Sequence, residues 1–187
     1  MEIKNFGGKK IKIRKLSKGD LRNVKKFPDF INSLIEEEAQ ILFNKKFSLK
    51  EERKYIQEQL RSIKNHKTVF LVAEDDKKII GTCGINLMVG RQEHIGNFGI
   101  TIAKGYRGMG LGSYLMKEII KLAKKEFKPK PKFIRLNVFP INKPAVSLYK
   151  KFGFKKVAVI PKQIEFQGKF LDEVIMLLYF DKFQNEK

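Results

Sequence analysis

The chain has 187 residues, of which 42% are hydrophobic, enough for a single domain with a substantial buried core. Lysine and arginine number 40 against 20 acidic residues, so the formal net charge is +20. No run of 18 apolar residues occurs, which excludes a membrane-spanning helix, and the first residues lack a signal peptide's apolar core. A single cysteine, Cys83, excludes an internal disulfide. We therefore expect a cytoplasmic protein that forms one domain, residues 1–187, without a metal.

The basic excess could attract nucleic acid, an anionic membrane or a polyanionic cofactor. The lysines are nevertheless scattered over every segment, and even the densest runs, at 9–15 and 128–132, resemble a strand with a solvated face and a proline-broken loop. The pattern favours dispersed surface charge over a nucleic-acid site.

In chain order, alternating apolar residues first predict a strand at 11–16. A sequence close to a capping box begins at Ser17 and starts a helical pattern, which we expect Pro28 to interrupt before a second helical piece at 31–35. A clearer capping box opens a further helix at 48–63.

Two β-rich runs follow at 68–74 and 78–88, and the polar residues 75–77 between them predict a hairpin turn. Cys83 lies in the second run, where a buried and unreactive thiol is expected. The stretch 91–99 then leads into a central strand.

Residues 100–112 combine a strand, a glycine-rich turn and the start of a helix. Glycine allows positive φ and lets a ligand approach the backbone closely. A helix N-terminus adds unpaired N–H groups and the positive end of the helix dipole. The stretch is therefore interpreted as a cradle for a pyrophosphate; the alternative is a tight packing turn.

Two familiar nucleotide motifs fail on spacing. A dinucleotide-binding fingerprint needs Gly-x-Gly-x-x-Gly and an acidic residue at the end of the next strand, whereas the strand at 133–139 ends without one. A Walker loop needs Gly-Lys-Ser/Thr, which does not occur. After that strand, Asn142 is expected to cap a short helix ending at Gly153, and residues 155–180 predict a β-hairpin with its turn near Gly168.

The glycine turn resembles the acetyl-CoA motif of the GNAT N-acetyltransferases, Arg/Gln-x-x-Gly-x-Gly/Ala after a strand. A second block of the family's signature follows at the right distance. The matching residues of the two blocks are Arg107, Gly110 and Gly112, then Leu136, Val138, Asn142, Ala145, Leu148, Tyr149, Gly153 and Phe154. The resemblance covers residues 68–180, and the hairpin spacing is similar to the branch with ribosomal-protein, amino-acid and phosphinothricin acetyltransferases.

The resemblance implies an α/β, GNAT-like fold with a mixed, twisted central sheet and helices on both faces. It further implies acetyl transfer from acetyl-CoA to a primary amine of a small molecule or a protein N-terminus. Backbone groups of the central strand would hold the pantetheine arm, and amides of the turn would hold the pyrophosphate. Arg107 either contacts phosphate or fixes the loop. The implied cofactor residues are Ile100, Thr101, Ile102, Arg107, Gly108, Met109, Gly110, Leu111, Gly112, Ser113 and Asn142.

The implied mechanism is direct attack of a neutral amine on the thioester. An alkylamine is mostly protonated at neutral pH, so a base must first remove a proton. Tyr149 matches the family's general acid, which protonates the departing thiolate. Glu93 and His94, just before the central strand, are the candidate bases, and the alternative for both is an ordinary surface turn.

The acceptor has no signature in the sequence, so amino acids, polyamines, antibiotic-like amines and protein N-termini all remain open. A homodimer is also open, and no membrane partner is expected. The competing function is a basic module that kept the CoA-binding fold without turnover and binds RNA or ribosomes.

Overall fold

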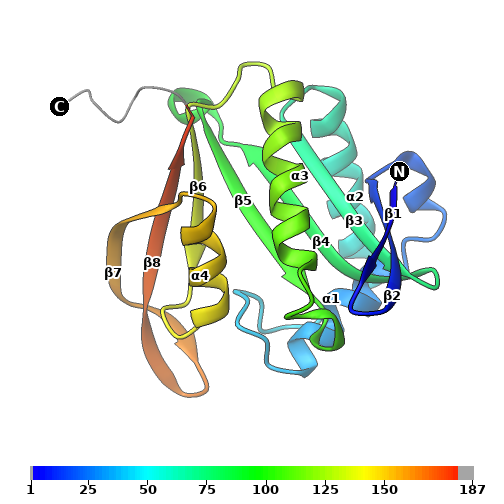
Figure 1. Ribbon diagram of the computed structural model, residues 1–187, viewed down its shortest axis with the longest axis horizontal. Coiled ribbons are helices and arrows are strands. Elements are labelled where there is room, and N and C mark those ends of the chain that lie inside the picture. The colour runs from blue at the N-terminus through cyan, green and yellow to red at the C-terminus, as the bar shows by residue number, and fades with distance from the viewer. Residues whose placement is uncertain (1, 181–187) are drawn as a thin grey trace. The chain divides into compact units, whose positions relative to one another are not determined.

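The computed structural model of the chain describes residues 2–180 (Figure 1). The strands are β1 (Glu2–Phe6), β2 (Lys9–Lys15), β3 (Thr68–Asp75), β4 (Lys78–Leu87), β5 (Ile95–Ile102), β6 (Phe133–Val138), β7 (Lys155–Phe166) and β8 (Lys169–Tyr179). The α-helices are α1 (Lys26–Glu36), α2 (Leu49–Lys64), α3 (Leu111–Glu126) and α4 (Lys143–Lys151). Short 3₁₀ turns are η1 (Lys18–Leu21), η2 (Gly90–Gln92) and η3 (Lys104–Tyr106).

The strands form a mixed sheet in the hydrogen-bonded order β1-β2-β3-β4-β5-β6-β8-β7. β5 and β6 pair in parallel, whereas the β1–β2, β2–β3, β3–β4, β6–β8 and β7–β8 ladders are antiparallel. The mixed sheet confirms that part of the predicted α/β fold class. The hairpin turn at 75–77 is confirmed as well, since Asp76 and Lys77 both have positive φ.

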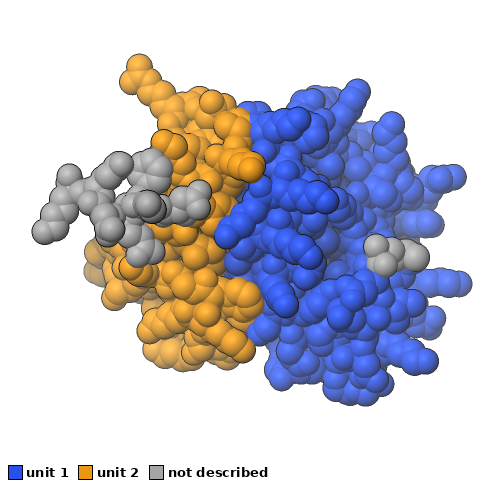
Figure 2. Space-filling model, turned by 45° about the horizontal axis from the view of Figure 1, so that its top comes forward, with its two compact units in different colours: residues 1–86, 99–128 blue, residues 87–98, 129–187 orange. Residues whose placement is uncertain are grey.

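The chain divides into two compact units, shown in different colours in Figure 2. Unit 1 comprises Met1–Asn86 and Gly99–Lys128, and unit 2 comprises Leu87–Phe98 and Pro129–Lys187. The strand β5 contributes its first half to unit 2 and its second half to unit 1. That the whole chain acts as one domain stays a prediction.

In unit 1, helices cover both faces of the sheet (Figure 1). Phe70 and Val72 of β3 belong to one hydrophobic cluster with Ile56 of α2 and three buried residues of α1. Successive side chains of a strand point to opposite faces, so Leu71 and Ala73 lie on the other face, where α3 packs against β3. Helices on both faces were predicted, and unit 1 confirms them.

Pro28 does not interrupt the first helix, contrary to the sequence prediction. Helix α1 begins at Lys26, so Pro28 occupies its first turn, where backbone N–H groups have no intrahelical partner. The break lies before Lys26, between η1 and α1.

A buried ion-pair network ties β2, β3 and η1 together. Arg14 reaches Asp20 at 2.6 Å and Glu74 at 2.7 Å, and all three side chains are at least four-fifths buried. Hydrogen bonds from Arg14 hold the pKa of Glu74 below its ordinary value. The chain between η1 and β2 is therefore held by charge as well as by apolar packing.

Replacing Arg14 with Met should destabilise the protein by about 3 kcal/mol, because two buried carboxylates lose their shared partner. Denaturant unfolding near neutral pH measures this. Lys46→Met is the matched control, since the Lys46–Glu36 pair is largely exposed and should contribute less than about 1 kcal/mol. Equal stability of the two variants would contradict a structural role for the network.

Candidate functional site

The turn between β5 and α3 has the backbone geometry that a phosphate cradle needs. Gly108 and Gly110 have φ of +79° and +91°, which side chains of L-residues rarely adopt. A Cβ added at either position would meet no atom within 4 Å. Glycine here keeps the backbone in a left-handed conformation, and the space above it is open to a ligand.

Helix α3 begins directly after this turn, with Gly110 as its N-cap. The Tyr114 N–H already donates to the Gly110 carbonyl at 3.1 Å, so the amides of Leu111, Gly112 and Ser113 belong to the unpaired first turn. Leu111 is fully buried and anchors the helix start. The turn thus presents N–H donors and the positive end of a 16-residue helix.

The loop before the turn is fixed by side chains from distant segments. Arg107 donates from Nε to the Ile102 carbonyl at 2.8 Å and forms an ion pair with Glu37. Tyr106 donates to Asp75 at 2.8 Å, and this hydrogen bond raises the pKa of the phenol. Of the two roles considered for Arg107, these contacts are those of a residue that fixes the loop.

The second half of β5 is half-buried at Ile100, Thr101 and Ile102. Thr101 and Thr82 of β4 share a hydroxyl hydrogen bond of 2.8 Å. The parallel ladder with β6 covers Ile95 to Asn97, while β5 itself continues to Ile102.

In unit 2, Asn142 and Tyr149 stand on α4. Asn142 caps the helix as predicted, its Oδ1 accepting from the Ala145 N–H at 3.2 Å. The ring of Tyr149 is buried and packs on Phe98 and Phe154, with ring centroids 6.0 Å and 5.9 Å away. These two ring contacts hold the Tyr149 side chain within unit 2.

The two candidate bases lie at the start of β5. Glu93 is exposed at the end of η2, and the ring of His94 packs edge-on against Phe133 at 5.7 Å. Phe98, on which Tyr149 packs, is four residues further along an extended strand, a separation of about 13 Å. His94 thus contacts the start of β6 through its ring and its carbonyl, and Tyr149 contacts β5 further along, at Phe98.

Sequence reasoning missed Glu52, a buried acid on α2. Glu52 is only 7% exposed, and burial alone raises the pKa of its carboxyl to about 7. Glu52 lies one helical turn before Ile56, which is fully buried. An acid on the apolar stripe of the 48–63 pattern was therefore visible in the sequence.

Replacing Glu52 with Gln should stabilise the protein at about pH 8 but not near pH 5. A raised carboxyl pKa favours the folded state only while the group is protonated, so this stability is lost as pH rises through about 7. Because the group is only partly shielded from solvent, we expect the free energy of unfolding of Glu52→Gln to exceed that of wild type by about 1–2 kcal/mol at the higher pH.

Melting temperatures at both pH values measure this effect. Glu51→Gln is the neighbouring control and should show no such gain, because hydrogen bonds from Ser48 lower the pKa of Glu51. If Glu52→Gln and wild type have the same melting temperature at both pH values, ionised Glu52 does not destabilise the folded protein, and the prediction is wrong.

Residues 31–154 match the family model described as the acetyltransferase (GNAT) family. The chain belongs to this family. The motif resemblance seen in the sequence is thereby confirmed, and with it the GNAT-like fold.

Individual relatives agree with this assignment. The L-amino acid N-acetyltransferase AaaT of Escherichia coli is 31% identical over 107 residues, which are 57% of this chain and 65% of AaaT, less than two thirds of that relative. A GNAT acetyltransferase structure from Streptococcus pneumoniae has a TM-score of 0.78 at 27% identity, covering 91% of this chain and 99% of the other. The YncA protein of Salmonella typhimurium was solved with its cofactor acetyl-CoA. It has a TM-score of 0.76 at 17% identity, covering 92% of this chain and 95% of the other.

Proteins similar to this chain also carry the names of ribosomal-protein-alanine and phosphinothricin acetyltransferases. Within residues 2–180, no helix is long and apolar enough to cross a membrane. Over the same residues, no group of three His, Cys, Asp or Glu side chains is placed to hold a metal ion.

Proposed function

We propose that this protein transfers the acetyl group of acetyl-CoA to a primary amine. The observation that carries the proposal is the open, glycine-lined turn at Gly108–Gly110, followed directly by the N-terminus of α3. Backbone N–H groups and a helix dipole are suited to the pyrophosphate of CoA. Membership of the GNAT family and the relatives' N-acetyltransferase names support the same activity.

Each part of the cofactor is assigned to backbone rather than to charged side chains. The amides of Gly108 to Ser113 hold the pyrophosphate, and the peptide groups of Ile100 to Ile102 pair with the pantetheine arm as an added strand. Arg107 is already bound to Ile102 and Glu37, so its part is to keep the loop in the receptive conformation. Asn142 keeps the start of α4 in place through its cap.

In the chemical step, the lone pair of the neutral amine attacks the thioester carbonyl carbon and forms the new N–C bond. The C–S bond then breaks, and Tyr149 supplies a proton to the departing thiolate. An N–H donor of β5 stabilises the negative charge on the carbonyl oxygen. Glu93 or His94 is the predicted proton acceptor for the incoming amine, directly or through water.

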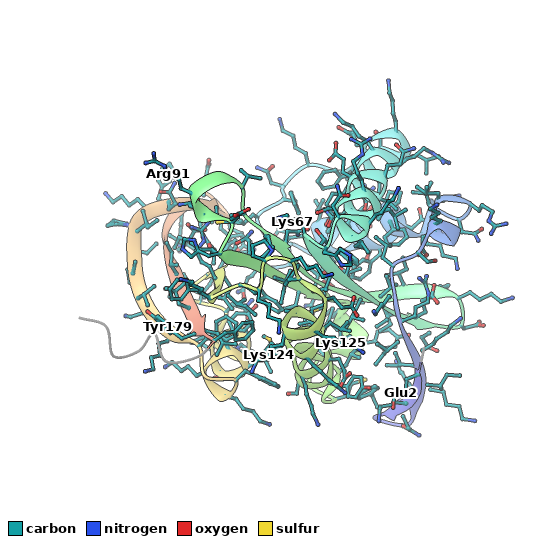
Figure 3. All side chains as sticks on the ribbon, turned by 90° about the horizontal axis from the view of Figure 1, so that it is seen from above. Glu2, Lys67, Arg91, Lys124, Lys125 and Tyr179 are labelled. Carbon is teal, nitrogen blue, oxygen red and sulfur yellow. The ribbon has the colours of Figure 1, made fainter. Side chains whose placement is uncertain are left out.

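The competing function, a basic module that binds RNA or ribosomes, is not favoured, because the matching family and the named relatives are N-acetyltransferases. Basic side chains do meet where the segment before β3 contacts the end of α3: the His66 carbonyl accepts from the Lys128 N–H at 3.1 Å, and Lys67, Lys124 and Lys125 belong to these two segments (Figure 3). The partners proposed for the protein are therefore acetyl-CoA and an amine, in the cytoplasm; homodimer formation stays a prediction.

A panel of acceptors tests the proposal and selects among the open substrate classes. Wild-type protein with acetyl-CoA is offered an amino acid, a polyamine, an aminoglycoside and a peptide with a free N-terminus, and thiol release is followed. We expect release above the hydrolysis background with at least one class. Background rates with all four would count against the proposed transfer.

A further inference from the structure

The sheet-facing stripe of α2 carries two polar side chains that the rest of the described chain does not pair: Glu52, a largely buried residue whose carboxylate oxygens still reach solvent, and Gln59. No hydrogen bond or ion pair reaches the carboxylate of Glu52 from any residue that the structure describes, although the residue is 93% buried. Seven residues further on, the buried Oε1 of Gln59 also has no hydrogen-bond partner. Buried polar groups in native proteins are nearly always paired, so the Gln59 oxygen lacks a partner, and the Glu52 carboxylate beside it on the same stripe is free to accept a hydrogen bond.

The position of Glu52 over the sheet follows from the antiparallel run of α2 and β3. The hydroxyls of Ser62 and Thr68 bond at 2.6 Å, which aligns the end of α2 with the start of β3. From Ser62 back to Glu52 is ten residues of helix, or about 15 Å. The same distance along β3 from Thr68 corresponds to roughly four to five residues. Glu52 therefore stands near the level of Val72.

Two contacts connect this level to the predicted cofactor strand. Val72 pairs with Thr82 of β4, and Thr82 bonds Thr101 of β5 at 2.8 Å. Directly opposite residues of paired strands share a face, and Val72 belongs to the cluster that contains Ile56 of α2. Gly99 lies two residues before Thr101 on β5, and so on the same face of the sheet. Space is open there, because a Cβ added at Gly99 would meet nothing within 4 Å.

The charges around Glu52 leave its carboxylate available. The elements packed against α2 are β3, η1 and α1, and their buried acids Glu74 and Asp20 are both held by Arg14. Lys26 of α1 also turns to Glu74, at 3.8 Å. On α2 itself, the charge of Glu52 adds to burial in raising the pKa of the Tyr55 phenol.

We propose that Glu52 selects a positively charged acceptor by accepting hydrogen bonds from its ammonium group. This rests on the proposed function and assigns the acceptor end of the same site. Leu49 and Tyr55, three residues before and after Glu52, are exposed apolar residues beside the carboxylate, at 48% and 40% exposure. The substrate class is therefore an ammonium group on an apolar carbon chain.

Calorimetric titration of n-hexylammonium chloride into the CoA-saturated protein tests the assignment at about pH 8, where Glu52 is ionised. We expect Glu52→Gln to weaken binding by about tenfold or more, since a charge-assisted hydrogen bond is lost. Affinity of the wild type should also fall as the pH drops below about 7. The neutral analogue n-hexanol should not distinguish Glu52→Gln from wild type.

Glu58→Gln is the matched control, an exposed acid on the same helix, and should bind the ammonium as wild type does. CoA affinity equal to wild type shows that Glu52→Gln is folded. Equal ammonium affinity of Glu52→Gln and wild type, or no ammonium binding to wild type, would overturn the inference. Glu52-dependent binding without thiol release from acetyl-CoA would leave it standing while the proposed function fails.

Discussion

Replacing Tyr149 with Phe should lower turnover by about 10²-fold or more while leaving affinity for acetyl-CoA nearly unchanged. The substitution removes a single hydroxyl. The ring contacts with Phe98 and Phe154 that orient the side chain depend on shape and remain. A loss confined to turnover is therefore the result expected of a proton donor, whereas a packing residue would affect stability first.

Steady-state kinetics with a saturating amine and direct titration of acetyl-CoA separate the two parameters. Tyr179→Phe is the matched control in the same unit: this tyrosine packs on Phe133 at 5.3 Å and has no proposed chemical role. An unaltered turnover number in Tyr149→Phe, with chemistry shown to be rate-limiting, would reduce Tyr149 to a core residue.

Gly110→Asp should weaken binding of CoA by well over tenfold. Asp tolerates the left-handed conformation better than most residues and is a good N-cap, so the helix itself should survive. Its carboxylate, however, would stand where the pyrophosphate is proposed to approach the first turn of α3. Repulsion between like charges then replaces the attraction of unpaired N–H groups.

Two controls separate charge from backbone strain in this experiment. Gly110→Asn has nearly the same shape without the charge and should lose much less affinity. Gly168→Asp introduces the same residue at φ of +70° in the β7–β8 turn, again with open space around it, and should bind CoA as wild type does. Equal affinity of Gly110→Asp and wild type in calorimetry would remove the cradle hypothesis.

Much of the fold and the cofactor end of the site could be predicted because their signals are local. Ser48 with Glu51 and Asn142 with Ala145 are caps formed within four residues, and both helices begin where the sequence indicates. The glycine turn is equally local, since positive φ at Gly108 and Gly110 strongly favours a residue without a side chain.

The features that escaped prediction depend on partners distant in sequence. Glu37 meets Arg107 across 70 residues, and Glu74 meets Arg14 across 60, so neither pairing leaves a local pattern. Strand β1 has little apolar alternation of its own and is defined by its ladder with β2. Glu52 differs from these, since its place on the apolar stripe of the 48–63 pattern is a local signal.

Following both products of one reaction tests the central claim most directly. Wild-type protein is incubated with isotopically labelled acetyl-CoA and the best acceptor of the amine panel, with and without added RNA, and mass spectrometry follows the labelled acetyl group. We expect one acetylated amine for each CoA thiol released, whether or not RNA is present. Tight, structure-selective RNA binding at physiological salt, with no label on any amine or peptide offered, would contradict it.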